Sequence, residues 1–175
     1  MLRPAIDIWA DRGLTGFAVL LIVLMLAISI QVLCSMLDIN PLAVFDAPYL
    51  LIGKAITLNS LLDFQWHLLA VIALLPAGLV WCRDGHVRVD FLYAQWTDRQ
   101  KAGIELIGHV VLTSPFLFLC VPASWSFMFS AWRSDQGSTN DGLNDLWLIK
   151  ATLPLGLALL CLVLVADIIK QARRF

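Results

Sequence analysis

The sequence has few charged residues for its length. Of its 175 residues, 14% are Asp, Glu, Lys or Arg and 60% are hydrophobic. A soluble domain carries about 25% charged residues. This deficit excludes a chain whose whole surface meets water, and the length suits a single domain over residues 1–175. We therefore predict an integral membrane protein.

Cysteines and catalytic motifs are also scarce. The four cysteines lie far apart, each in or at the end of an apolar run: Cys34, Cys82, Cys120 and Cys161. Their spacing matches no metal site, so we interpret them as small hydrophobic residues. The sequence has no phosphate-binding loop, nucleophile elbow or zinc motif. We therefore predict neither an enzyme nor a cofactor, and no nucleic-acid partner.

Long apolar runs are what the sequence does contain. Four of them can cross a hydrocarbon core about 30 Å thick at 1.5 Å per residue. We predict transmembrane helices over residues 17–37, 64–82, 106–132 and 146–169. The first run is too long for a signal peptide, so we expect it to stay uncleaved. Pro76 should kink the second span, and the long third span should tilt, protrude or break near Pro115 or Pro122.

The segment between the first two spans is shorter and more polar. It reads DAPYLLIGKAITLNSLL, with Asp46 as a helix cap and Pro48 in the first turn. An apolar face would be formed by Leu51, Ala55, Leu58 and Leu62. We predict an in-plane amphipathic helix over residues 47–62, with a loop helix packed on the bundle as the alternative. Asp63 would then cap the second span.

The most polar stretch follows Cys82. Val89, Leu92, Tyr93 and Trp96 indicate a short helix at the membrane interface. Thr97 and Gln100 have capping-box spacing, so a new helix is expected to begin there. The fold prediction is thus an all-α membrane protein with four transmembrane helices and one in-plane helix.

The basic residues are distributed unevenly between the loops. Nine lie on one side of the predicted membrane: Arg3, Arg12, Arg83, Arg88, Arg99, Lys101, Lys170, Arg173 and Arg174. Three lie on the other side: Lys54, Arg133 and Lys150. Short loops rich in Lys and Arg stay in the cytoplasm. We therefore predict that both termini are cytoplasmic.

Ionisable residues are missing from the middle of the predicted spans. Glu105, Lys150 and Asp167 each lie within about a turn of a helix end, where they can reach the interface or pair. His67 and His109 belong to opposite ends of their spans, so they would not ligate one haem. The chain alone therefore has little with which to carry a solute.

Residues 83–93, RDGHVRVDFLY, resemble the signature of the small membrane (Q) subunit of TRAP transporters, the tripartite ATP-independent periplasmic transporters. Gln65–Trp81 is similar to the second helix of that family. Gly137–Leu160 is similar to its last loop and fourth helix. One departure is Gln65, where an acidic residue is common, and this removes an ion pair from that position.

The resemblance implies a transport function in the bacterial inner membrane. The small subunit would scaffold a large permease subunit, which uses an ion gradient, such as sodium, to take up an organic solute. A periplasmic binding protein would deliver that solute, commonly a carboxylate. We expect partner contacts from two groups of residues: Arg83, His86, Arg88 and Asp90 inside, and Trp66, His67 and Lys150 outside.

Three alternatives remain open from the sequence. The 83–90 cluster could be satisfied within its own loop, for example by Arg88 with Asp84. The chain could instead anchor a redox complex, in which case the purified protein would show haem absorbance. It could also be a small autonomous transporter working as a homo-oligomer, which would take up solute without another subunit.

Overall fold

The described part of the chain folds into four long helical segments and one small β-hairpin. The computed structural model describes residues 3–83, 85, 95–140 and 142–172. Its elements are α1 (Arg3–Met36), β1 (Ala43–Tyr49), β2 (Gly53–Ile56), α2 (Leu58–Leu74), α3 (Ala77–Cys82), α5 (Asp98–Gly108), the π-helix η1 (His109–Thr113), α6 (Ser114–Arg133), α7 (Trp147–Lys150) and α8 (Thr152–Ala172). The stretches long and apolar enough to cross a membrane are Asp11–Met36, Leu58–Cys82, Asp98–Arg133 and Trp147–Ala172. The four predicted spans are confirmed, although several of their ends differ by a few residues.

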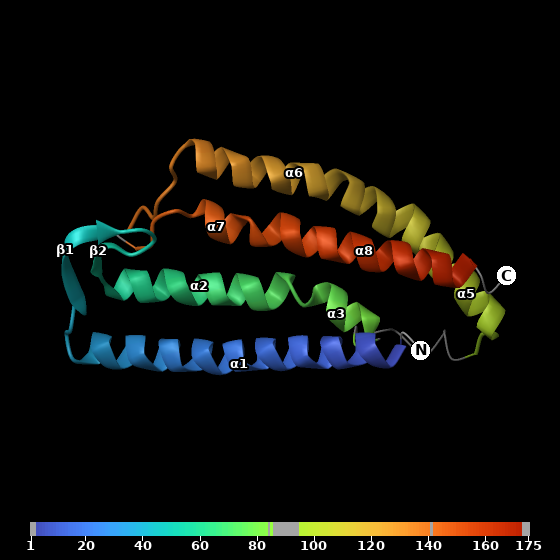
Figure 1. Ribbon diagram of the computed structural model, residues 1–175, viewed down its shortest axis with the longest axis horizontal. Helices are drawn as coiled ribbons and strands as arrows, with labels where there is room; N and C mark the ends of the chain where they lie inside the picture. Colours follow the sequence, from blue (N-terminus) through green and yellow to red (C-terminus); the bar gives the residue numbers. More distant parts are fainter. Residues whose placement is uncertain (1–2, 84, 86–94, 141, 173–175) are drawn as a thin grey trace.

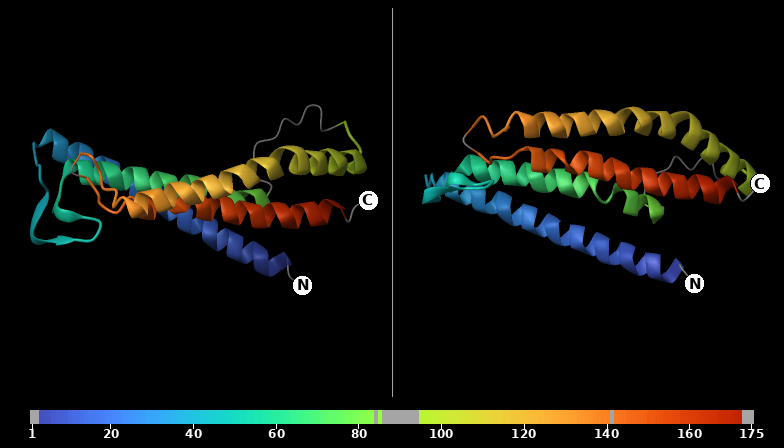
Figure 2. Two further views of the ribbon diagram at one scale, coloured as in Figure 1. Left: turned by 90° about the horizontal axis from the view of Figure 1, so that it is seen from above. Right: turned by 45° about the horizontal axis from the view of Figure 1, so that its top comes forward.

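The long segments lie side by side in an open row (Figure 1). At one edge α1 packs on α2 and α3, which pack on α8. At the other edge α8 packs on α5 and α6. Figure 2 shows α1 diverging from its neighbours toward its N-terminus. The row therefore differs from a closed bundle, because its helices leave wide faces uncovered.

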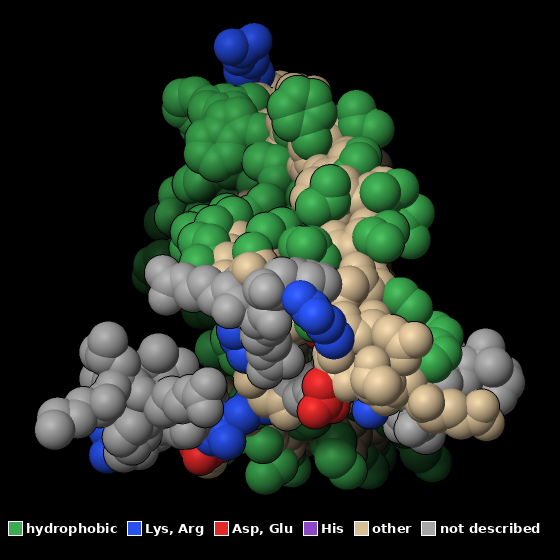
Figure 3. All heavy atoms as spheres, turned by 90° about the vertical axis from the view of Figure 1, so that its right-hand side faces the viewer, with side chains coloured by type: hydrophobic (Ala, Val, Ile, Leu, Met, Phe, Trp, Pro, Cys, Tyr) green, Lys and Arg blue, Asp and Glu red, His purple; other side chains and the backbone are tan. Residues whose placement is uncertain are grey.

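The two ends of the row are formed by different elements. One end holds β1, β2 and the loop of residues 134–146, and we call it the hairpin end. Both termini lie at the opposite end, with α5 and the end of α3, and we call it the terminal end (Figure 1). Figure 3 views the terminal end and shows Lys, Arg, Asp and Glu side chains gathered below the hydrophobic surface of α6.

Small residues bring the helices together. The buried hydrophobic residues of the described chain are Ala27, Leu68, Ala102, Leu117, Ala131, Leu143 and Leu164. No large side chain among the described residues is fully buried. Membrane helices associate through small residues that let backbones approach, since lipid supplies no hydrophobic drive between helices. The three buried alanines follow this rule, whereas the other four buried hydrophobic residues are leucines.

Gly156 marks the closest approach between α2 and α8. A Cβ atom there would lie 2.7 Å from the carbonyl oxygen of Leu74. Gly78 has a similar position on α3, where a Cβ would lie 3.4 Å from the carbonyl oxygen of Leu159. Gly156 therefore sets the spacing at the centre of the row, whereas the distance at Gly78 is an ordinary van der Waals contact.

The predicted amphipathic helix over residues 47–62 is wrong. Residues 43–56 form an antiparallel hairpin instead, with Ala43 opposite Ile56 and Tyr49 opposite Gly53. Gly53 adopts φ +70°, a conformation that glycine reaches without the steric cost of a Cβ. The β-branched and aromatic residues on either side of this turn favour extended backbone.

The start of the second span also differs from the prediction. Thr57 caps α2, and its side chain accepts a hydrogen bond from the backbone N–H of Ser60 (3.1 Å). The Ser60 hydroxyl accepts in return from the N–H of Thr57 (3.2 Å). This reciprocal pair satisfies two N–H groups that the first turn leaves free. The cap therefore lies six residues before the predicted one, Asp63, which is inside α2.

Prolines interrupt two of the spans. Pro76 separates α2 from α3, as predicted, because it has no N–H to continue the helix. In the third span the π-helix His109–Thr113 lies just before Pro115. The carbonyl oxygen of His109 accepts from both the backbone N–H and the hydroxyl of Ser114 (2.8 Å for the hydroxyl). The predicted irregularity near Pro115 is confirmed, whereas Pro122 lies within α6.

The third span is longer than a bilayer requires. Its 36 residues extend over about 54 Å at 1.5 Å per residue, against a hydrocarbon core of about 30 Å. Thr97 caps α5 in a capping box with Gln100, which confirms the predicted helix start. The excess length lies at the terminal end, where α5 projects beyond its neighbours (Figure 1). The short helix expected around residues 89–96 falls mostly outside the described residues.

Candidate functional site

The candidates predicted near the cytoplasm are only partly described by the structure. Arg83 forms an ion pair with Asp11 and so joins the end of α3 to α1. His86, Arg88 and Asp90 lie outside the described residues. Arg83 is about one-third exposed, so part of its side chain remains accessible for other contacts.

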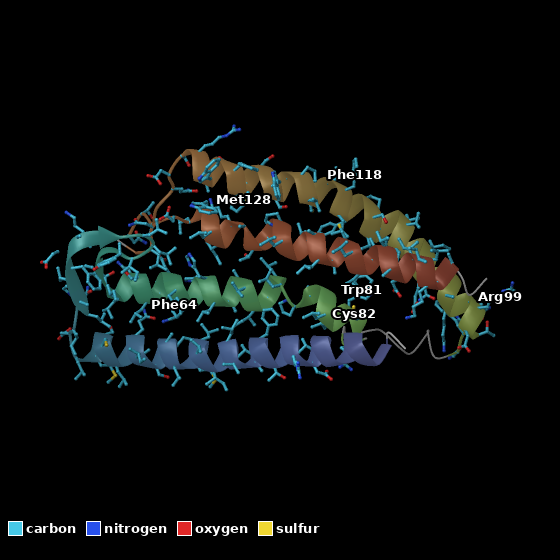
Figure 4. The ribbon with its side chains drawn as sticks, viewed as in Figure 1. Phe64, Trp81, Cys82, Arg99, Phe118 and Met128 are labelled. Carbon is cyan, nitrogen blue, oxygen red and sulfur yellow. The ribbon has the colours of Figure 1, made fainter. Side chains whose placement is uncertain are left out.

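A polar cluster joins three helices at the terminal end. The indole Nε1 of Trp81 donates to Asp167 Oδ2 (3.4 Å), and His109 Nε2 lies 3.8 Å from the same oxygen. The Trp81 and His109 rings face each other with centroids 5.3 Å apart. Trp81 lies between α3 and α8 (Figure 4). The cluster therefore fastens α3 and η1 to α8.

Further contacts continue this cluster along α8. Lys170 Nζ lies 3.6 Å from Asp167 Oδ1, and Gln171 Nε2 donates to a carboxylate oxygen of Glu105. Glu105 lies seven residues after the start of α5 and Asp167 five residues before the end of α8, so both lie farther from a helix end than the single turn expected from the sequence. Their partners were not predicted, because the pairing depends on how α5 and α8 lie against each other. Sequence reasoning also missed Gln171.

A second polar cluster lies at the hairpin end. Asp63 Oδ2 accepts from the N–H of Leu143 (3.0 Å), and the side chain of Asn59 donates to the carbonyl oxygen of Asn140 (2.6 Å). His67 Nδ1 donates to the carbonyl oxygen of Asp63 (2.5 Å). The bonds of Asp63 and Asn59 hold the loop between α6 and α7 against α2, whereas the His67 bond lies within α2.

Lys150 and Trp66, the other two residues predicted to contact a partner outside the membrane, have different surroundings. Lys150 Nζ donates to Gln136 Oε1 (2.5 Å) and lies 4.2 Å above the Phe127 ring, so it joins α7 to α6. Trp66 is 63% exposed on α2. Trp66 is therefore open to a partner, whereas Lys150 and His67 are engaged within the chain.

Two glutamines form a buried amide pair between α1 and α2. Gln65 Nε2 donates to Gln31 Oε1 (2.6 Å) and to the carbonyl oxygen of Ala27 (3.3 Å). Gln65 is buried, and its amide pairs without a charge. Gln65 thus acts as a neutral link between two spans.

In the part of the chain that the structure describes, the polar side chains form links between helices. Among the described residues, no group of three or more His, Cys, Asp and Glu side chains could hold a metal ion. The four cysteines are free thiols. His67 lies fourteen residues before Trp81 in the second span, whereas the His109 ring lies beside Trp81, so the two imidazoles do not meet. A groove of about 490 Å³ runs along α6, lined by Trp125, Ser126, Phe129, Ser130, Arg133 and Ser134.

Comparison with known proteins gives one family. The family described as "Tripartite ATP-independent periplasmic transporters, DctQ component" matches residues 51–174. Searches of curated proteins and of solved structures give no significant match. The matched range includes the last three spans and both polar clusters. It covers well over half of the chain, and its members are transporter subunits rather than enzymes.

Proposed function

The chain belongs to the DctQ component family of TRAP transporters, and we propose that it braces the large permease subunit of such a transporter. The large subunit holds the solute and sodium sites and spans the membrane many times. A periplasmic binding protein delivers an organic solute, a carboxylate, and the ion gradient drives its uptake. The small subunit carries no solute itself.

The open row of helices is the observation that carries this proposal. A row leaves each spanning segment with exposed apolar side chains on its faces. Polar clusters at both ends, and the glutamine pair between α1 and α2, keep the row stiff. A flat, stiff set of helices offers a large surface to a partner of the same depth in the membrane. This is the form that a brace requires.

We place the terminal end in the cytoplasm and the hairpin end in the periplasm. Nine of the twelve basic residues belong to the terminal end or to the loops assigned to it. The positive-inside rule then puts both termini in the cytoplasm. In this orientation the hairpin and the loop of residues 134–146 face the binding protein.

The partner contacts involve two surfaces. Trp66 is the strongest candidate near the hairpin end, because large exposed aromatic side chains anchor protein interfaces. The basic stretch that contains Arg83, His86, Arg88 and Asp90 provides the cytoplasmic contact. Lys150 supports the interface indirectly by joining α7 to α6 and to Gln136 of the 134–146 loop, whereas His67 makes its hydrogen bond within α2.

Copurification tests the proposal. The chain should be purified in mild detergent from cells that express the large subunit, and the copurifying proteins quantified by mass spectrometry. We expect a large hydrophobic permease in equal amount. Trp66→Ala and the pair Arg88→Ala/Asp90→Ala should lower that amount, whereas Trp132→Ala, an exposed tryptophan on α6, serves as the matched control. Recovery of the chain without a permease would refute the proposal.

A further inference from the structure

The β1–β2 hairpin has an apolar turn. Its tip reads Tyr49-Leu50-Leu51-Ile52, whereas turns usually carry Gly, Pro, Asn, Asp or Ser. Leu50 is 81% exposed and Tyr49 is 58% exposed. Exposed apolar groups of this kind mark a surface that something covers.

The turn is held in place by the loop between α6 and α7. Leu51 adopts φ +73°, a left-handed conformation that is costly for a residue with a Cβ. Its carbonyl oxygen accepts a hydrogen bond from the N–H of Asn144 (2.8 Å). The side chain of Asn144 also lies against Gly53, where it would be 3.0 Å from an added Cβ. The strained turn is thus fixed by a loop that is itself tied to α2.

The hairpin lies beside the helices rather than beyond them. It leaves the line of the row to one side, and its turn points back until it is level with the start of α2 (Figures 1 and 2). The helix axes cross the bilayer, so this direction brings the turn toward the membrane surface. A hairpin that binds a protein in the aqueous phase would point away from the membrane surface.

The segment that leads from α1 to the hairpin is also apolar and exposed. It includes Met36, the last residue of α1, and Leu37 and Ile39, which follow it. The hairpin's two charged residues, Asp46 and Lys54, are exposed as well. Apolar side chains with flanking charges suit the boundary between headgroups and acyl chains, where tyrosine is also enriched.

From this geometry we propose that the hairpin is an interfacial lipid anchor. Its turn, residues 49–52, enters the headgroup–acyl boundary of the leaflet next to α1 and α2, and Asp46 and Lys54 stay among the headgroups. The anchor fixes the depth of α1 and α2, to which the hairpin is joined directly. This inference requires neither the large subunit nor a particular orientation.

Spin-label accessibility in lipid nanodiscs tests the anchor. The full chain, with its four native cysteines replaced by alanine, receives one label at Leu50→Cys. Matched controls are Leu26→Cys on the exposed face of α1 and Thr139→Cys in the exposed loop. We expect the ratio of collisions with oxygen to collisions with a water-soluble nickel complex to be several-fold higher at residue 50 than at residue 139.

Further labels and conditions keep the test decisive. Tyr49→Cys should behave as Leu50→Cys does, and Asp46→Cys should give a value between those of residues 50 and 139. Nickel accessibility at residues 49 and 50 equal to that at residue 139 would overturn the proposal. So would protection from both reagents in the complex with the large subunit, because a protein would then cover the turn.

Discussion

Gly156 controls how closely α2 and α8 pack. At Gly156 the backbone of α8 lies so near the Leu74 carbonyl that an added methyl group meets backbone rather than a flexible side chain. No property of the sequence distinguishes Gly156 from Gly108, which has open space around its Cα. The difference arises from the crossing of α2 and α8, which a single sequence does not reveal.

Gly156→Ala should lower the free energy of unfolding by about 1–3 kcal/mol, the usual cost of overpacking. Unfolding in mixed SDS micelles, followed by circular dichroism, measures it. Gly108→Ala is the control and should leave the stability unchanged or raise it slightly. Equal effects of the two substitutions would contradict the close approach.

The glutamine pair should show energetic coupling. Gln65→Leu and Gln31→Leu each remove one partner of the same hydrogen bond, so their effects on stability should not add. We expect a coupling energy of about 0.6 kcal/mol, typical of hydrogen bonds between membrane helices. Ser29→Ala, which removes a hydroxyl bonded within α1, should show no coupling to Gln65→Leu. Strict additivity of the glutamine changes would argue against the pair.

At the scale of elements, the sequence predicted a helix start correctly where no competing capping residue lay nearby. Thr97 and Gln100 follow a polar loop, and they predicted the start of α5 correctly. Thr57 and Ser60 were missed, because Asp46 and Pro48 supply an equally good helix start upstream. The hairpin depends on the turn at Leu51 and Gly53, and the Asn144 hydrogen bond to Leu51 comes from a loop more than ninety residues later. Local sequence could not supply that contact.

The π-helix sets the rotation of α5 relative to α6. Deleting Val111 should convert η1 into a regular α-helix and rotate α5 by about 100°, the angle that one residue spans at 3.6 residues per turn. Glu105 would then leave Gln171. A disulfide between Glu105→Cys and Gln171→Cys should form in the full-length chain and fail in the deletion variant.

Val111→Ala provides the control, because it shortens the side chain and keeps the residue count. It should leave the crosslink intact. A crosslink that survives the deletion would show that the position of α5 does not depend on η1.

At the scale of the whole molecule, the number of spans was predictable and their arrangement was not. Apolar run length alone identifies four crossings, since each must cover the same hydrocarbon thickness. The open row depends on which faces of the helices pack, and the exposed apolar side chains of a membrane helix resemble those that touch another helix. For the same reason, the sequence does not indicate which surface contacts the partner.

The orientation leads to a separate prediction. Thr139→Cys, in the loop at the hairpin end, should react in intact spheroplasts with a maleimide that cannot cross the membrane. The experiment uses a cysteine-free background. Arg99→Cys, at the tip of α5 (Figure 4), should react only after the cells are opened. The reverse pattern would invert the topology.

Solute uptake by proteoliposomes tests the bracing role most directly. Vesicles should contain the large subunit with this chain, the large subunit alone, or this chain alone, each with the binding protein, the solute and an inward sodium gradient. We predict uptake that depends on sodium in the first preparation, a large loss in the second and none in the third. Uptake by this chain alone, or full uptake without it, would contradict the account.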